Sequence, residues 1–173
     1  NKDATVTFEG GTYEALTVGG VPIIQNGGVV NLKYVNFNAT GSFDYGVIVN
    51  NGWFENDGTI NIQNGTILDC GGNTGIGVGC IAGGTVNMYG GSIVQNTAKY
   101  GGGIYLYSDS TSCGSTFNMY GGSITENAAV QDAGGVHVNG DSAFFMYDGS
   151  ITKNTAGRGG GGLYINGGNV FSM

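Results

Sequence analysis

One recurring motif constrains the fold of this 173-residue chain more than any other feature. Each copy contains an apolar residue, a Met-Tyr pair, a glycine-containing turn and a Ser-Ile pair. An Asn and a glycine run follow, and they lead into a short apolar segment. The three clearest copies are Val86–Ile93, Phe117–Ile124 and Phe144–Ile151. Repetition of this kind predicts a stack of similar structural units.

Weaker copies precede these three. Ile60–Ile67 fits the same template, whereas Val30–Phe37 and Val6–Tyr13 fit it loosely. If the last residue of each copy is the anchor, successive anchors are 24, 30, 26, 31 and 27 residues apart. The anchors are Tyr13, Phe37, Ile67, Ile93, Ile124 and Ile151, and Phe171 begins a seventh unit. A period of this length without helical segments is typical of a solenoid, and it is too short for a propeller blade of about 40–45 residues.

Glycine accounts for 37 residues and proline for one. Collagen is excluded because it needs glycine at every third position and abundant proline. A helical bundle is excluded because each interior glycine costs a helix about 1 kcal/mol. Asn-Gly pairs keep stacked hairpins as an alternative. Yet each unit contains three short strands, with corners at the double glycine, the Asn and the glycine run. We therefore predict an all-β fold, a single-stranded parallel β-helix of about six coils with three short strands per coil.

Strand residues alternate between the two faces of a sheet, so every second residue of each strand should point inward. The predicted interior columns are Val86, Phe117 and Phe144; Met88, Met119 and Met146; Ile93, Ile124 and Ile151; Ile104, Val136 and Leu163; and Leu106, Val138 and Ile165. Asn96, Asn127 and Asn154 share one corner, where we expect a ladder of amide hydrogen bonds along the axis. Cys70 is expected at that corner one coil earlier.

The spacing Ile93-x-x-Asn96, followed by Gly101-Gly102-Gly103-Ile104, resembles the FxxN and GGA[ILV] repeats of polymorphic outer-membrane proteins. It is still more similar to the glycine-rich repeats of adhesin-like surface proteins of bacteria and archaea. Ile replaces the Phe of the outer-membrane motif, and Gly replaces its Ala. The resemblance covers residues 84–173 well and 1–83 weakly. It implies a right-handed β-helix that is extracellular, attached to the cell surface and used for adhesion.

The domain organisation follows from the same pattern. We expect one β-helix domain over residues 1–173, with irregular coils in 1–83 and regular coils in 84–173. The resemblance implies that this domain is a fragment of a longer surface protein. End-to-end self-association through open coil ends is a further expectation, because unpaired strand edges invite strand addition.

Two outward columns of the predicted helix are aromatic. The first strand of each coil gives Glu9, Lys33, Gln63, Tyr89, Tyr120 and Tyr147, with Asn61, Asn87 and Asn118 alongside. The strand after the glycine run gives Ile48, Gly79, Tyr105, His137 and Tyr164. Neighbouring aromatic side chains stabilise a sheet by about 0.2–1 kcal/mol per pair, which is a purely structural explanation. The functional interpretation is a flat aromatic platform on which sugar rings stack, with the Asn amides bonding hydroxyl groups.

Catalytic and metal-binding residues are harder to find. His137 is the only histidine and is expected to be exposed on its strand, without a second His or Cys at metal-ligand spacing. Asp109 and Asp141 each follow a stacked apolar position by three residues, so we expect them on adjacent rungs about 5 Å apart. Such a pair would suit calcium or a retaining glycosidase, although aspartate is also common at plain turns. Glu126 and Lys153 are expected to form an exposed ion pair between rungs.

Cys70, Cys80 and Cys113 match no zinc site, and an odd number argues against a complete disulfide framework. They are expected either as buried small side chains or as one bridge, Cys70–Cys80 or Cys80–Cys113.

The formal net charge is −7. Nucleic-acid binding is excluded because that needs clustered cations. Membrane insertion is also excluded, since no apolar run approaches about 20 residues.

Three functions fit this sequence. The first is a non-catalytic adhesin-like module that is structural or binds a glycan or a host surface. The second is a polysaccharide lyase or hydrolase, although the five cations do not cluster as such an enzyme would require. The third is a rigid spacer that holds another domain away from the cell.

Overall fold

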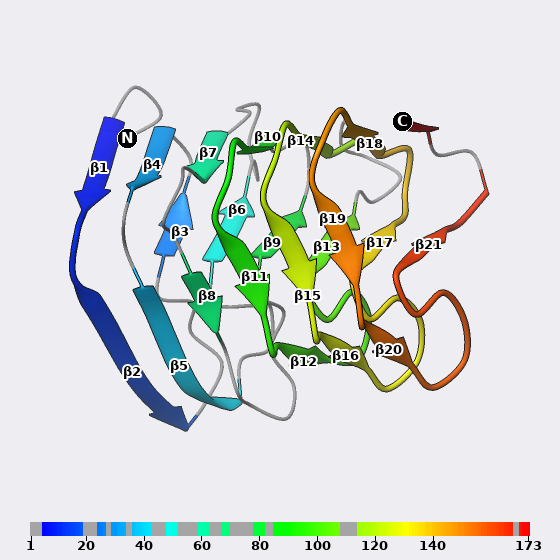
Figure 1. Ribbon diagram of the computed structural model, residues 1–173, viewed down its shortest axis with the longest axis horizontal. Helices are drawn as coiled ribbons and strands as arrows, with labels where there is room; N and C mark the ends of the chain where they lie inside the picture. The colour runs from blue at the N-terminus through cyan, green and yellow to red at the C-terminus, as the bar shows by residue number, and fades with distance from the viewer. Residues whose placement is uncertain are drawn as a thin grey trace.

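The chain folds into a parallel β-helix in which successive coils stack along one axis (Figure 1). The computed structural model describes residues 5–18, 24–26, 29–33, 36–42, 48–51, 59–62, 67–69, 78–81, 85–107, 114–167 and 170–173. All the strands pair in parallel, each with the equivalent strand of the next coil. None of the described segments is a helix long and apolar enough to cross a membrane.

Four sheets, called A to D, make up the walls of the β-helix. The strands of each sheet are given in their order along the axis. Sheet A contains β1 (Thr5–Glu9), β4 (Val29–Lys33), β7 (Thr59–Ile62), β10 (Thr85–Met88), β14 (Thr116–Met119), β18 (Ala143–Met146) and β22 (Val170–Ser172). Sheet B contains β2 (Thr12–Val18), β5 (Asn36–Ser42), β8 (Ile67–Asp69), β11 (Ser92–Val94), β15 (Ser123–Thr125) and β19 (Ser150–Thr152). Sheet C contains β3 (Ile24–Asn26), β6 (Ile48–Asn51), β9 (Val78–Ile81), β13 (Ile104–Tyr107), β17 (Val136–Val138) and β21 (Leu163–Ile165). Sheet D contains β12 (Thr97–Ala98), β16 (Ala128–Ala129) and β20 (Thr155–Ala156).

The predicted coils are confirmed, with one addition. Six coils each contribute one strand to sheets A, B and C, and β22 starts a seventh. The fourth, fifth and sixth coils also carry a two-residue strand in sheet D, directly after the ladder asparagine. The sequence alone does not reveal this strand, because two residues are too few for an alternating pattern.

The β-helix is right-handed. In Figure 1 the chain advances from left to right, the strands of sheet B on the near side run downward, and those of sheet C behind them run upward. This is the hand that parallel crossover connections almost always adopt, because strands twist to the right.

The strand register confirms most of the repeat and corrects two positions. Along sheet A the column Val6, Val30, Ile60, Val86, Phe117, Phe144 and Phe171 is in register, which reproduces the predicted spacings. In sheet B, however, Leu68 rather than Ile67 pairs with Ile93. In sheet C, Val49 rather than Ile48 pairs with Gly79. Both errors are one-residue slips, and a one-residue slip moves a side chain to the opposite face of its sheet.

The predicted interior columns are confirmed in the fourth and fifth coils, whereas in the sixth coil Met146, Ile151 and Leu163 are partly buried and Ile165 is 37% exposed. The fourth and fifth coils bury them completely, and the residues with no exposed surface include Val86, Met88, Ile93, Ile104, Leu106, Phe117, Met119, Ile124, Val136, Val138 and Phe144. The Phe117 and Phe144 rings stack with centroids 4.9 Å apart, and Phe171 continues the column at 5.3 Å. Because the fourth, fifth and sixth rungs present similar apolar groups, these columns form one continuous core through those coils.

The corners between sheets hold unusual backbone conformations. Gln95, Glu126 and Lys153 precede the three ladder asparagines and have φ of 57°, 57° and 56°. This left-handed conformation costs an L-residue about 1–2 kcal/mol, so the packing of the coils must supply that energy. It turns the chain so that the next side chain, the asparagine, points into the core.

Candidate functional site

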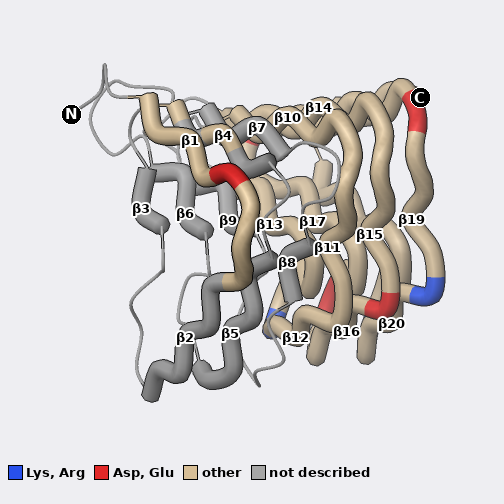
Figure 2. The backbone as a smooth tube through the Cα atoms, turned by 60° about the vertical axis from the view of Figure 1, so that its left-hand side comes forward, with Lys and Arg blue, Asp and Glu red and all other residues tan. Residues whose placement is uncertain are grey.

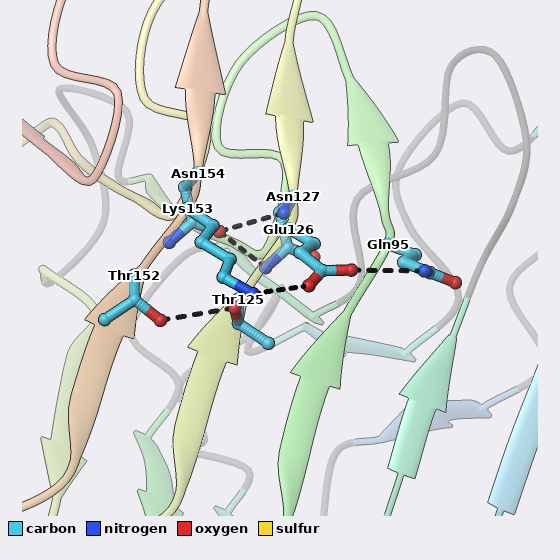
Figure 3. Close-up of polar contacts among 7 residues, drawn as sticks. All are labelled: Gln95, Thr125, Glu126, Asn127, Thr152, Lys153 and Asn154. Atoms are coloured by element: carbon cyan, nitrogen blue, oxygen red, sulfur yellow. Dashed lines mark hydrogen bonds and ion pairs between the residues drawn. The ribbon is translucent and has the colours of Figure 1, made fainter.

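The asparagine ladder predicted from the sequence is confirmed, and Figure 3 shows its Asn127–Asn154 step. The Nδ2 group of Asn96 donates to Oδ1 of Asn127 at 2.8 Å, and Nδ2 of Asn127 donates to Oδ1 of Asn154 at 2.9 Å. Backbone N–H groups of Asn96 and Asn127 donate to the same two oxygens, at 3.0 and 2.9 Å. Asn96 and Asn127 are fully buried, so the ladder is a structural support of the coil stack.

A polar ladder on the surface runs beside this buried one (Figure 3). Nζ of Lys153 lies 3.4 Å from Oε1 of Glu126, and Nε2 of Gln95 donates to Oε2 of the same carboxylate at 3.3 Å. The expected ion pair between Glu126 and Lys153 is thus confirmed. Both side chains are largely exposed, so the pair contributes at most about 1 kcal/mol.

The first aromatic column lies at the corner between sheets A and B. Tyr89 and Tyr120 stack with centroids 5.1 Å apart and planes 8° apart, and Tyr120 and Tyr147 stack at 4.9 Å and 4°. The three side chains are 49%, 41% and 64% exposed. This is the largest regular group of exposed aromatic side chains among the described residues.

These rings do not form a flat platform. Coplanar phenol rings cannot lie with their centres about 5 Å apart, because their edge hydrogens would overlap; they must be stacked face to face. Tyr120 therefore turns both faces towards its neighbours, which cover them in part, and offers a ligand mainly its edge and hydroxyl group. The column is thus a row of ring edges and hydroxyl groups, one per rung. Tyr147, at the end of the row, is the most exposed of the three rings.

Polar side chains flank the tyrosine column on both sides. On sheet A, Nδ2 of Asn118 donates to Oδ1 of Asn87 at 2.9 Å, and the register places Asn61 in the same column. On sheet B, the hydroxyl groups of Ser92 and Ser123 lie 2.9 Å apart and are hydrogen-bonded. The tyrosine edges thus lie between two rows of uncharged hydrogen-bonding groups.

The second aromatic column lies on sheet C, and its histidine is not where we expected it. Tyr105, His137 and Tyr164 are in register, with ring centroids 5.1 Å apart in both contacts. However, only 4% of His137 is exposed. The prediction of an exposed histidine is therefore wrong. Neither of its ring nitrogens has a hydrogen-bond partner among the described residues.

Besides its two strand neighbours, His137 is covered by a residue from a corner of the coil. The ring centroid of Tyr100 lies 5.6 Å from that of His137 and 6.2 Å from that of Tyr105. Nζ of Lys99 lies 5.3 Å from the Tyr100 centroid. Tyr100 and the buried Asp132 were missed by the sequence analysis, since both stand outside the repeating strands. A signal was present, because each directly precedes the glycine-rich corner of its coil.

Burial sets the ionisation of this aromatic cluster. The pKa of His137 is lowered mainly by burial, which disfavours the charged ring, and the negative charge of Asp132 opposes that shift. The pKa of Tyr105 is raised, also mainly by burial, and a hydrogen bond from the Asn139 side chain opposes it. A neutral imidazole packed between tyrosines is thus the native state of His137.

This cluster predicts a pH-dependent stability. The unfolded chain titrates His137 near 6.5, whereas the native state does so at a lower pH. Between these two values the unfolded state binds more protons, so stability is full above pH 6.5 and falls as the pH is lowered towards the native pKa. We expect His137→Phe to remove this pH-dependent part of the free energy of unfolding. Urea midpoints of both proteins between pH 8 and pH 5 test it, and parallel curves for the two proteins would contradict it.

The acidic pair and the cysteines remain predictions. Asp109, Cys70 and Cys113 lie outside the described residues, and Cys80 is in β9, in register with Leu106. Asp141 is exposed at a turn with φ of 53°, and a Cβ atom at Gly114 of the previous coil would clash with its backbone carbonyl. Within the part of the chain that the structure describes, no three His, Cys, Asp or Glu side chains are grouped so as to hold a metal ion.

Comparison with known proteins gives no relative: no protein-family model, no curated protein and no solved structure matches this chain.

Proposed function

We propose that this chain is a non-catalytic, cell-surface β-helix module that binds glycan through the first aromatic column. The observation that carries the proposal is the row of three exposed tyrosines held at fixed spacing, with amides and hydroxyls on both sides. Tyrosine is well suited to such a surface because it offers apolar contact and a hydroxyl group with few rotatable bonds. The extracellular location rests on the resemblance of the repeats to adhesin-like surface proteins.

The composition of this surface favours binding over catalysis. Glycoside hydrolysis uses two carboxyl groups on either side of the scissile bond, about 5–9.5 Å apart. The repeated segments 85–94, 116–125 and 143–152 contain one carboxylate, that of Asp148. A glycoside hydrolase site on this surface would thus lack its second acidic group.

The test is a triple substitution of Tyr89, Tyr120 and Tyr147 by Ala. We expect at least tenfold weaker binding to the glycans that the wild-type protein retains on an array, since aromatic anchors often contribute more than 1 kcal/mol each. Tyr107→Ala is the matched control, because Tyr107 is a partly exposed tyrosine on sheet C. Unchanged glycan binding by the triple variant, with its thermal unfolding intact, would refute the proposal.

A spacer function is the second candidate. It is favoured by the shape of the molecule, since the first and last strands, β1 and β22, lie at opposite ends of the stack in Figure 1. A spacer needs no ligand, so a protein that binds no glycan on the array would support this alternative.

A further inference from the structure

The surface around the tyrosine column has no charged residue in segments 85–94 and 116–125 of the fourth and fifth coils. We call the outward face of sheets A and B in the fourth to sixth coils the polar strip. Its residues are Thr85, Asn87, Tyr89, Ser92 and Val94, and their counterparts Thr116, Asn118, Tyr120, Ser123 and Thr125, and Ala143, Phe145, Tyr147, Ser150 and Thr152. Figure 2 shows β10, β14, β11 and β15 without any charged residue. Asp148 is the one charged residue in the three segments.

Few cations lie near the polar strip. Among the described residues, Lys33 is in β4, two coils before the strip, Lys99 and Arg158 follow β12 and β20, and Lys153 directly follows Thr152 at the edge of the strip. Lys153 is paired with Glu126, and Arg158 donates to Gln131 at 3.3 Å. The cation at the edge of the strip is thus already paired with a carboxylate, so a polyanion would gain little from it, and the net charge of −7 would repel a polyanion.

The chemistry of the polar strip repeats along the axis but not across the strands. Moving along the axis, Tyr89 is followed by Tyr120 and Tyr147, and Ser92 by Ser123 and Ser150, whereas Asn87 is followed by Asn118 and then by Phe145. Each step is one rung, about 4.8 Å. Moving across one rung, a ligand would meet an amide, a phenol, glycines and a hydroxyl in turn. A polymer made of one repeating unit therefore matches the polar strip along the axis, but not across a rung.

We propose that the polar strip binds a neutral, linear, hydroxyl-bearing polysaccharide that lies parallel to the axis of the β-helix. This inference rests on the proposed glycan-binding function of the tyrosine column and adds the charge and the direction of the ligand. The sugar C–H groups contact the ring edges of the tyrosines, and the sugar hydroxyls exchange hydrogen bonds with the tyrosine hydroxyls and the flanking Asn and Ser side chains.

Charge is tested first, with calorimetric titration of two oligosaccharide series of equal length. The neutral probes are β-linked glucose and mannose oligomers of two to six units, and the acidic probe is a galacturonic acid series. We expect the wild-type protein to bind a neutral series and to bind the acidic series at least tenfold more weakly. Ser123→Lys, which places one cation on the polar strip, should narrow this difference by strengthening the binding of the acidic series.

The direction of the bound polysaccharide is tested with Tyr89 and Tyr147, the two outer rings of the column, which are two rungs apart. Tyr89→Ala and Tyr147→Ala should each weaken binding of a hexasaccharide at least threefold, while affecting a disaccharide less. Affinity should also rise with oligomer length until the ligand spans the three tyrosines. A ligand lying across a single rung would show no dependence on length beyond two or three units, and would respond to one of the two substitutions, not to both.

The outcomes separate this inference from the proposed function. Tighter binding of the acidic series, lost in the triple tyrosine variant, would leave the glycan-binding function standing and overturn the inference of a neutral ligand. Length-independent binding of the neutral series would overturn the direction. No binding to any array glycan would overturn both proposals. Thermal unfolding of each variant confirms that a lost signal reflects the surface rather than the fold.

Discussion

Asn127→Leu should destabilise the protein by about 3–5 kcal/mol, a large fraction of the 5–15 kcal/mol typical of a folded domain. Leu has nearly the shape of Asn but removes both the acceptor of Asn96 and the donor to Asn154. It also leaves the carbonyl of Ile93 without the 3.0 Å hydrogen bond from Nδ2 of Asn127. Because Asn96 and Asn127 are fully buried, water cannot replace the hydrogen bonds lost between them. Urea denaturation followed by circular dichroism measures the loss.

Asn118→Leu is the matched control. Asn118 lies in the same coil, and its side chain donates one hydrogen bond, to Asn87 on the outer face, where solvent can substitute for the lost partner. We expect a cost of at most about 1 kcal/mol. If the two substitutions were equally costly, the buried ladder would not be the support that its geometry indicates.

Gly135→Ala should destabilise the protein by about 3 kcal/mol, at the upper end for an overpacked core. A Cβ atom at Gly135 would clash with the backbone carbonyl oxygen of Gly162 in the next coil. It would also lie 3.0 Å from Cγ2 of Ile151 and 3.1 Å from Nδ2 of Asn154. The coil cannot move away, because the Val136 N–H donates to that same Gly162 oxygen at 2.8 Å. The midpoint of thermal or urea unfolding measures this effect.

Gly162→Ala provides the internal comparison. Gly162 holds the same place one coil later, and a Cβ there would meet one atom, Cγ2 of Ile151, at an ordinary 3.5 Å. Its φ is outside the left-handed region, so Ala is tolerated and restricts the unfolded chain. We expect a change between zero and a gain of about 1 kcal/mol. A loss equal to that of Gly135→Ala would show that backbone flexibility, rather than contact between coils, explains the glycine at both places.

The fold was predictable because every coil of a β-helix needs the same pattern of inward side chains and corner residues. Strand alternation and the spacing of the motif were enough to assign the interior columns around Phe117 and the ladder at Asn127, both of which depend on equivalent positions in adjacent coils. The two slips, at Ile67 and Ile48, occurred in the early coils, where the motif is weak. There an added or missing residue between strands leaves no mark in the apolar pattern.

The candidate site was less predictable, because alternation assigns a side chain to a face but not to an environment. His137 does point away from the interior, as its place on the strand predicts, yet Tyr100 from a corner and the adjacent Tyr105 and Tyr164 bury it. For the same reason the sequence located the tyrosine column but not the orientation of its rings. Stacking along the axis follows from rung spacing and is invisible in any single repeat.

The direction of the hydrogen bonds between coils has a mechanical consequence. These bonds run along the axis, whereas the covalent chain runs around it, so tension between the two ends of the stack pulls coils apart one rung at a time. The coil from Phe117 to Phe144 adds about 4.8 Å to the stack. Drawn out straight, its 27 residues would span about 90 Å. Under load the molecule is therefore a tether that lengthens stepwise, absorbing force at its outermost coil while the remaining coils, and any ligand on them, stay in place.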